Sequence, residues 1–141
     1  MSRRIPGALR VRIAEAEPVA LAERGGRLVL LDAAGRVLPF DPSIVAADLP
    51  VADTDSGVAR LLSRIRETDP RFFGRIERGL KWRTDVALDL PAGRVLFRTG
   101  ASADEIRDLL LVEQYLTQTG KRWKELDARF ASRVFVRGMG A

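Results

Sequence analysis

The sequence contains no cysteine and no histidine. Without cysteine the chain has no disulfide bond, no thiol nucleophile and no thiolate metal site, and without histidine it lacks the side chain best suited to proton transfer near neutral pH. Neither a glycine-rich phosphate-binding loop nor a calcium-binding loop occurs in the sequence. We therefore expect a protein that is not an enzyme and that needs no cofactor or metal ion.

Long apolar runs are also missing. No stretch approaches the roughly 18 apolar residues of a membrane-spanning helix. The first residues, MSRRIPGALRVRIAEAEP, lack the apolar core of a secretory signal. We expect the chain as given to be soluble.

The net charge of +5 is concentrated near the C-terminus. Residues 121–141 hold six Lys and Arg residues against two acids, whereas the first 120 residues hold 18 cations against 17 acids. A basic segment of this kind is able to bind nucleic acid, an anionic membrane surface or an acidic protein segment. Nucleic acid is disfavoured because lysine is scarce and aromatic residues make up only 6% of the chain. A basic domain for nucleic acid or an anionic membrane surface remains the alternative function.

Short apolar runs, several of them alternating with charged residues, predict a series of strands. The turns at residues 33–35 and 91–93 contain glycine and indicate tight hairpins. Residues 39–55 contain three prolines and are expected to form an ordered loop. The expected strands are residues 9–13, 18–21, 27–32, 36–38, 75–83, 86–90, 94–98, 123–130 and 133–137.

Two helices are expected between these strands. The first has Ser56 as its N-cap, ends at Asp69-Pro70 and is followed by a further turn through residues 70–73. The second begins at a capping box of Ser102 and Glu105 and ends at Gly120. Its expected buried face consists of Ile106, Leu109, Leu110 and Leu116, widened by Leu111, Val112 and Tyr115. This order of elements predicts an α+β fold, in which a mostly antiparallel sheet of hairpins carries two helices on one face and the C-terminal strand lies at the sheet edge.

The basic stretch, proline and hairpin of residues 3–38 and the two terminal strands within residues 120–137 together resemble the FtsQ family of bacterial cell-division proteins, called DivIB in Gram-positive bacteria. Residues 3–38, RRIPGALRVRIAEAEPVALAERGGRLVLLDAAGRVL, are similar to a family segment in which a basic stretch and a proline precede strands and a Leu-Val-Asp-x-x-Gly hairpin. Residues 120–137 resemble the end of the family's β domain, where a V-D-L-R-Y strand precedes the last strand. The chain departs from that pattern at Phe130, usually tyrosine, at Arg133, often a turn glycine, and at Ala128, usually a larger apolar residue.

The resemblance implies a non-enzymatic scaffold of the divisome at the septum. Family members are anchored in the inner membrane by one N-terminal helix, followed in the periplasm by a POTRA domain and a β domain. Residues 1–24 would be the last strands of a POTRA-like domain and residues 25–141 the β domain. The anchor and most of the POTRA domain would then be missing, and Met1 would be a cloning start or a misplaced gene start.

The resemblance also implies partners and a site. In the family, FtsQ binds FtsB, with FtsL alongside, and the complex regulates septal peptidoglycan synthesis. FtsB adds a strand to the last strand of the sheet, and Arg129 matches a family arginine that faces an acidic residue of the partner. The expected partner-binding residues are Arg129, Phe130, Ser132, Val134, Val136 and Trp123.

The sequence leaves other interpretations of these residues open. The edge from Arg133 to Arg137 is also explained as an ordinary sheet edge protected by charge. Phe130 is also explained as a core aromatic, and Ser132 as a residue that only closes the hairpin. For Trp82 we expect packing in the core or at its rim.

Overall fold

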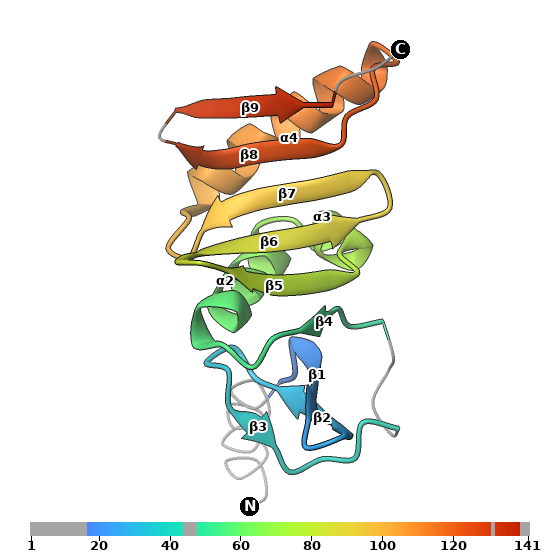
Figure 1. Ribbon diagram of the computed structural model, residues 1–141, viewed down its shortest axis with the longest axis vertical. Helices are drawn as coiled ribbons and strands as arrows, with labels where there is room; N and C mark the ends of the chain where they lie inside the picture. Colours follow the sequence, from blue (N-terminus) through green and yellow to red (C-terminus); the bar gives the residue numbers. More distant parts are fainter. Residues whose placement is uncertain (1–16, 44–47, 131, 139–141) are drawn as a thin grey trace, which may run out of the picture.

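The computed structural model describes residues 17–43, 48–130 and 132–138 (Figure 1). The strand expected at residues 9–13 lies outside the described residues, as does Met1. The strands are β1 (Ala20–Arg24), β2 (Arg27–Leu31), β3 (Val37–Leu38), β4 (Val51–Ala52), β5 (Arg78–Trp82), β6 (Asp85–Leu90), β7 (Gly93–Arg98), β8 (Glu125–Phe130) and β9 (Arg133–Arg137). The helices are α2 (Ser56–Thr68), α3 (Pro70–Arg75) and α4 (Ala103–Gln118).

The described strands form one sheet in the order β3-β2-β1-β4-β5-β6-β7-β8-β9. Most neighbours are antiparallel, but β4 is parallel to both β1 and β5, and β7 is parallel to β8. Parallel neighbours need a crossover connection, so α2 and α3 connect β4 to β5, and α4 connects β7 to β8. The described helices lie on one face of the sheet, and none of them covers the other face, here called the open face (Figure 1). The predicted α+β class and the C-terminal edge strand are confirmed.

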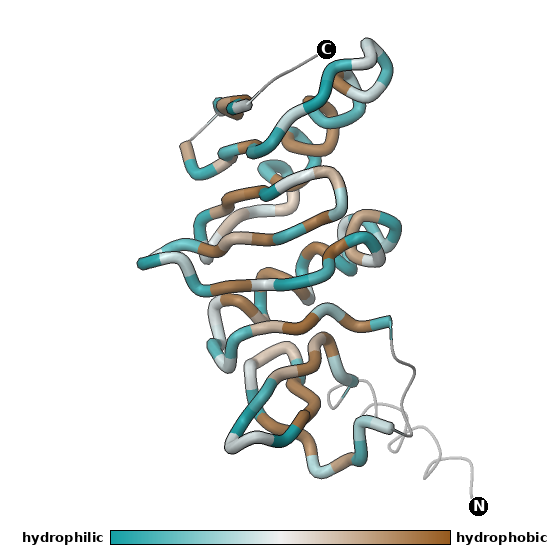
Figure 2. The backbone as a smooth tube through the Cα atoms, turned by 45° about the vertical axis from the view of Figure 1, so that its right-hand side comes forward, coloured by the Kyte–Doolittle hydropathy of each residue, from teal (hydrophilic) through white to brown (hydrophobic). Residues whose placement is uncertain are grey.

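One hydrophobic core lies between the sheet and the helices. Hydrophobic residues are concentrated along the central strands (Figure 2), where residues 86–88 of β6 and 95–97 of β7 are buried without interruption. Every second side chain of a strand is directed to the helices. Burying each large apolar side chain stabilises the fold by about 1.5–3 kcal/mol. The largest fully buried side chains include Phe72, Phe97, Leu61, Leu62, Ile65, Leu88, Ile106, Leu109 and Leu126. None of the described helices combines the length and the apolar content needed to cross a membrane.

The helix starts follow local capping chemistry. The predicted capping box of α4 is confirmed, because the Ser102 hydroxyl accepts the Glu105 N–H and the Glu105 carboxylate accepts the Ser102 N–H. The predicted N-cap of α2 is wrong by one residue. Asp55 has the extended backbone of a cap and its carboxylate accepts the N–H of Val58 at 3.1 Å, so Ser56 is the first helical residue.

The exposed side of α4 is more apolar than expected. Leu111 and Tyr115 were expected to widen the buried face, but their exposed fractions are 64% and 58%. Val112, the third of these residues, is partly buried and its side chain packs against the core. The helix ends at Gln118 with Thr119 as its C-cap, so Gly120 is the C′ residue as predicted. Its φ of +70° is strained for other residues.

Several element boundaries differ from the sequence-based expectation, among them the first strand, which is Ala20–Arg24, and the strand expected from residue 123, which begins at Glu125. Helix α3 extends to Arg75, so the strand expected from residue 75 begins at Arg78. The loop expected at residues 39–55 contains the two-residue strand β4. The domain boundary expected after residue 24 stays a prediction. It lies at the turn of the β1–β2 hairpin, where Arg24 pairs with Arg27, and β1 shares one sheet with the later described strands.

Candidate docking site at the C-terminal edge of the sheet

Strand β9 is the outermost strand at one end of the sheet. It pairs with β8 on one side, and no described strand pairs with its other side. The hairpin contains a register shift between Asp127 and Phe130, and its turn includes Ser132, whose φ of +60° is unusual for a residue other than glycine. Ala131, the other expected turn residue, lies outside the described residues. The edge predicted from the sequence is therefore present, with Ser132 at one end of it.

The backbone of β9 presents hydrogen-bonding groups to the open side. The carbonyl of Arg137 accepts the N–H of Lys124 at 3.0 Å, so the backbone groups of Arg137 are directed toward β8. Because these groups alternate in direction along a strand, those of Phe135 and Arg133 are also directed toward β8. The N–H and C=O groups of Val134 and Val136 are therefore directed toward the open edge.

The side chains of β9 divide between the two faces of the sheet. Val134 and Val136 pack against the core and are half-buried. Phe135 alternates with them, is 42% exposed and contacts Phe130 edge-to-face, with ring centroids 5.3 Å apart. Phe130, one of the expected contacts, is 48% exposed. Phe135 was missed as a candidate, although the alternation in RVFVR already separates it from the valines.

A small cavity of about 130 Å³ opens between α4 and the β8–β9 hairpin. Asp108 and Val112 line it from the helix, and Arg133 and Val134 line it from β9. The α4 side of the edge therefore offers an apolar and acidic surface next to the half-buried valines.

The side chain of Arg129 forms ion pairs within the protein. Its guanidinium donates to both carboxylate oxygens of Asp127, at 2.9 and 2.8 Å, and lies 3.4 Å from Asp85. Its side chain is only 25% exposed. The positive charge of Arg129 is thus balanced by carboxylates of β8 and β6, which makes Arg129 a residue that supports β8.

Asp127 is the centre of this cluster, and its side chain is fully buried. Burial by itself raises the pKa of Asp127, but hydrogen bonds from the side chain and backbone of Arg129 and from the side chain of Arg137 outweigh that effect and lower the pKa to about 2. Arg137 also pairs with Glu125. The charged residues of β8 and the end of β9 therefore form a network that neutralises itself.

The two tryptophans differ from expectation in opposite ways. Trp123, expected at the docking surface, is 6% exposed and belongs to the core. It covers Gly93, where a Cβ atom would lie 2.6 Å from the indole ring. Trp82, expected in the core or at its rim, is 41% exposed, with the guanidinium of Arg94 5.6 Å from its ring centre. Trp123 therefore joins β7 to the start of β8 and is not part of the accessible docking surface.

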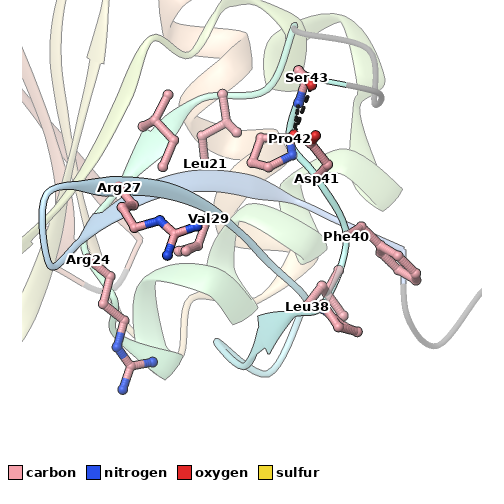
Figure 3. A pocket seen from close by; sticks show the side chains of 11 residues that line it. Leu21, Arg24, Arg27, Val29, Leu38, Phe40, Asp41, Pro42 and Ser43 are labelled. Carbon is pink, nitrogen blue, oxygen red and sulfur yellow. Dashed lines mark hydrogen bonds between the residues drawn. The ribbon is translucent and has the colours of Figure 1, made fainter.

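A larger depression of about 920 Å³ lies at the other end of the sheet, between the β1–β2 hairpin and the segment after β3 (Figure 3). Its lining is mainly apolar and holds one acid, Asp41, whose carboxylate accepts both the N–H and the hydroxyl of Ser43. This contact is a local turn, which explains the orientation of both side chains. Within the described parts of the chain, no three potential metal-binding side chains converge.

Comparisons with models of known protein families and with curated proteins found no match.

Proposed function

We propose that this protein is a non-enzymatic docking domain that binds a partner by adding a β-strand of that partner to β9. The observation that supports the proposal is the direction of the Val134 and Val136 backbone groups, which offer main-chain donors and acceptors at the edge. In strand addition, main-chain hydrogen bonds supply affinity and alternate side chains supply specificity. A partner strand would also complete the burial of the two valine side chains.

The proposal includes the cell-division role that the FtsQ resemblance implies. The partner is then FtsB-like, with an FtsL-like protein alongside, and the domain helps regulate septal peptidoglycan synthesis at the extracytoplasmic face of the plasma membrane. The order of the elements and the position of the last strand at the sheet edge are consistent with this role. The contact residues in this proposal are Phe130, Ser132, Val134, Val136 and Phe135.

Arg129 and Trp123 act indirectly in this proposal. Arg129 pairs with Asp127 of its own strand and with Asp85 of β6, and Trp123 packs the start of β8 against Gly93 of β7. Replacing Arg129 with glutamate would place a third carboxylate beside Asp127 and Asp85, so loss of binding in that variant would report a disturbed fold. A useful test must therefore change the edge and leave this cluster intact.

The experiment uses proline substitutions in β9. Val134→Pro and Val136→Pro each remove an N–H that is directed outward, and proline is tolerated on an edge strand at such positions. Both variants should retain the native circular dichroism spectrum and lose binding to the extracytoplasmic part of the FtsB-like protein from the same cell, measured by titration calorimetry. Phe135→Pro is the matched control, because it removes an N–H directed toward β8 and should destabilise the hairpin. Unchanged binding by the folded Val134 and Val136 variants would disprove docking at this edge.

A further inference from the structure

The order of the side chains in β9 does not distinguish one direction of a partner strand from the other, so that only the backbone polarity of β9 does so within the strand. Residues 133–137, RVFVR, read the same from either end. The two arginines differ only through their surroundings. Arg137 is paired with Glu125 and Asp127, whereas Arg133 forms no ion pair among the described residues. Charge complementarity between β9 and a partner therefore depends on the residues around the two ends of the strand.

Unpaired positive charge gathers at the C-terminal end of β9. Lys121, Arg122 and Lys124 are exposed and line one depression of about 660 Å³ together with Gly138. The Lys124 side chain lies directly beside Gly138, where a Cβ atom would be 2.7 Å from it. Within the described residues none of these three cations belongs to an ion pair, since the ion pairs of this region use Arg129 and Arg137.

The end of α4 does not require these cations as capping groups. The carbonyl of Leu116 accepts the N–H of Lys121 and the carbonyl of Thr117 accepts the N–H of Gly120. The Thr119 hydroxyl donates to the carbonyls of Tyr115 and Leu116. The last carbonyls of the helix are thus satisfied by backbone and hydroxyl groups. The side-chain charges of the cluster remain available to a ligand.

The opposite end of β9 is close to electrically balanced. Arg133 and Asp108 line the same small cavity, and Glu105 is paired with Arg98. Asp104 is paired with Arg107 on the outer side of α4. The edge therefore has a strongly basic end beside Gly138 and a nearly neutral end beside Ser132.

We infer that the partner of β9 carries an acidic segment at one end of its added strand, and that this segment lies over Lys121, Arg122 and Lys124 beside Gly138. The inference rests on the proposed strand addition at β9. Isolated exposed ion pairs contribute little, but several cations in one cluster attract an acidic segment together and steer its approach. Because the side chains of RVFVR read the same from either end, the position of the acids in the partner sequence adds to the backbone hydrogen-bond pattern in selecting the direction of the added strand.

The test uses two synthetic peptides with a strand core of alternating valine and threonine. One peptide ends in three glutamates, and the other carries glutamines at those positions. At low salt the glutamate peptide should bind about tenfold more tightly than the glutamine peptide, and this advantage should decrease as salt is added. A spin label at the glutamate end should broaden the amide resonances of Lys124 and Gly138 more than that of Arg133.

Variants that remove positive charges show which cations cause the tighter binding of the glutamate peptide. Combining Lys121→Gln, Arg122→Gln and Lys124→Gln should abolish the advantage of the glutamate peptide, and Arg133→Gln, the control at the other end, should retain it. Equal losses in the two proteins would overturn the location of the acidic segment. Tighter binding of duplex DNA or anionic vesicles than of the glutamate peptide to the same cluster would overturn the acidic peptide as its ligand.

Failure of the docking proposal would look different. If Val136→Pro left binding of both peptides unchanged, strand addition at β9 would be wrong whatever the charges do. If Val136→Pro abolished binding of both peptides and the glutamates made no difference in the wild-type protein, strand addition would stand and the acidic segment would be wrong.

Discussion

Strands β8 and β9 are neighbours in one hairpin, and both combine apolar residues with arginines, yet they differ in what they expose. In β8, Leu126 and Asp127 are fully buried, and Arg129 is neutralised by carboxylates. In β9, the valines are half-buried and Phe135 is exposed. The difference shows that an arginine in a strand is evidence for a binding partner only where the fold places no carboxylate beside it.

The largest expected contrast between the two strands is in core packing. Leu126→Ala should lower the free energy of unfolding by about 3 kcal/mol, because the side chain is fully buried and its removal leaves a cavity. Val136→Ala should cost about 1 kcal/mol, because that side chain is already half in water. Urea denaturation measures both values. Equal costs would contradict the assignment of β9 as an open edge.

The buried carboxylate of β8 is expected to give the next largest effect. Asp127→Asn keeps the shape of the side chain but removes its charge, and Arg129 and Arg137 lose charge-assisted hydrogen bonds. We expect a loss of about 2 kcal/mol, measured by thermal or urea unfolding. Glu125→Gln is the matched control, since this residue is more exposed and pairs with one arginine, and it should cost less than about 1 kcal/mol.

The same carboxylate makes stability depend on pH. The pKa of Asp127 is about 2 in the folded protein, against an ordinary value of 3.8 for an aspartate side chain, so the folded state favours the ionised form. This contribution is fully present above the unfolded pKa and is lost as the pH falls toward 2, with a loss of about 2 kcal/mol. Unfolding at a series of pH values should show a smaller loss over this range in Asp127→Asn. An identical loss in both proteins would contradict this pKa.

A further small effect on stability, similar to that of Val136→Ala, is expected at the exposed aromatic pair. Phe135→Ala should cost about 1 kcal/mol, because Phe135 is 42% exposed and mainly contacts Phe130. If Phe135 belongs to the docking surface, the same variant should weaken partner binding much more than it weakens the fold. Calorimetry and urea denaturation on one protein sample compare the two effects. A loss of stability above about 3 kcal/mol would place Phe135 in the core instead.

Local patterns predicted the elements well where each element depends on its own residues. Alternation in RVFVR predicted β9 with both its boundaries, and the spacing of Ser102 and Glu105 predicted the start of α4. The exposure of single large side chains was predicted poorly. Trp123 is buried because β7 presents Gly93 beneath it, and Trp82 is exposed because β5 directs it to the open face. The residues next to each tryptophan in the sequence reveal neither the contact of Trp123 with Gly93 nor the face to which β5 directs Trp82.

The sequence by itself determined the α+β order of elements, the capping box of α4, the terminal hairpin and the excess of positive charge near the C-terminus. These features depend on periodicity, on local hydrogen bonds and on composition. Only the tertiary structure decided which arginines are neutralised, since Asp85 reaches Arg129 from 44 residues away. Among the described residues, the fold pairs Arg129 and Arg137 with carboxylates of β6 and β8, because folding brings these charges together in space. The cations beside Gly138 belong to none of these described ion pairs.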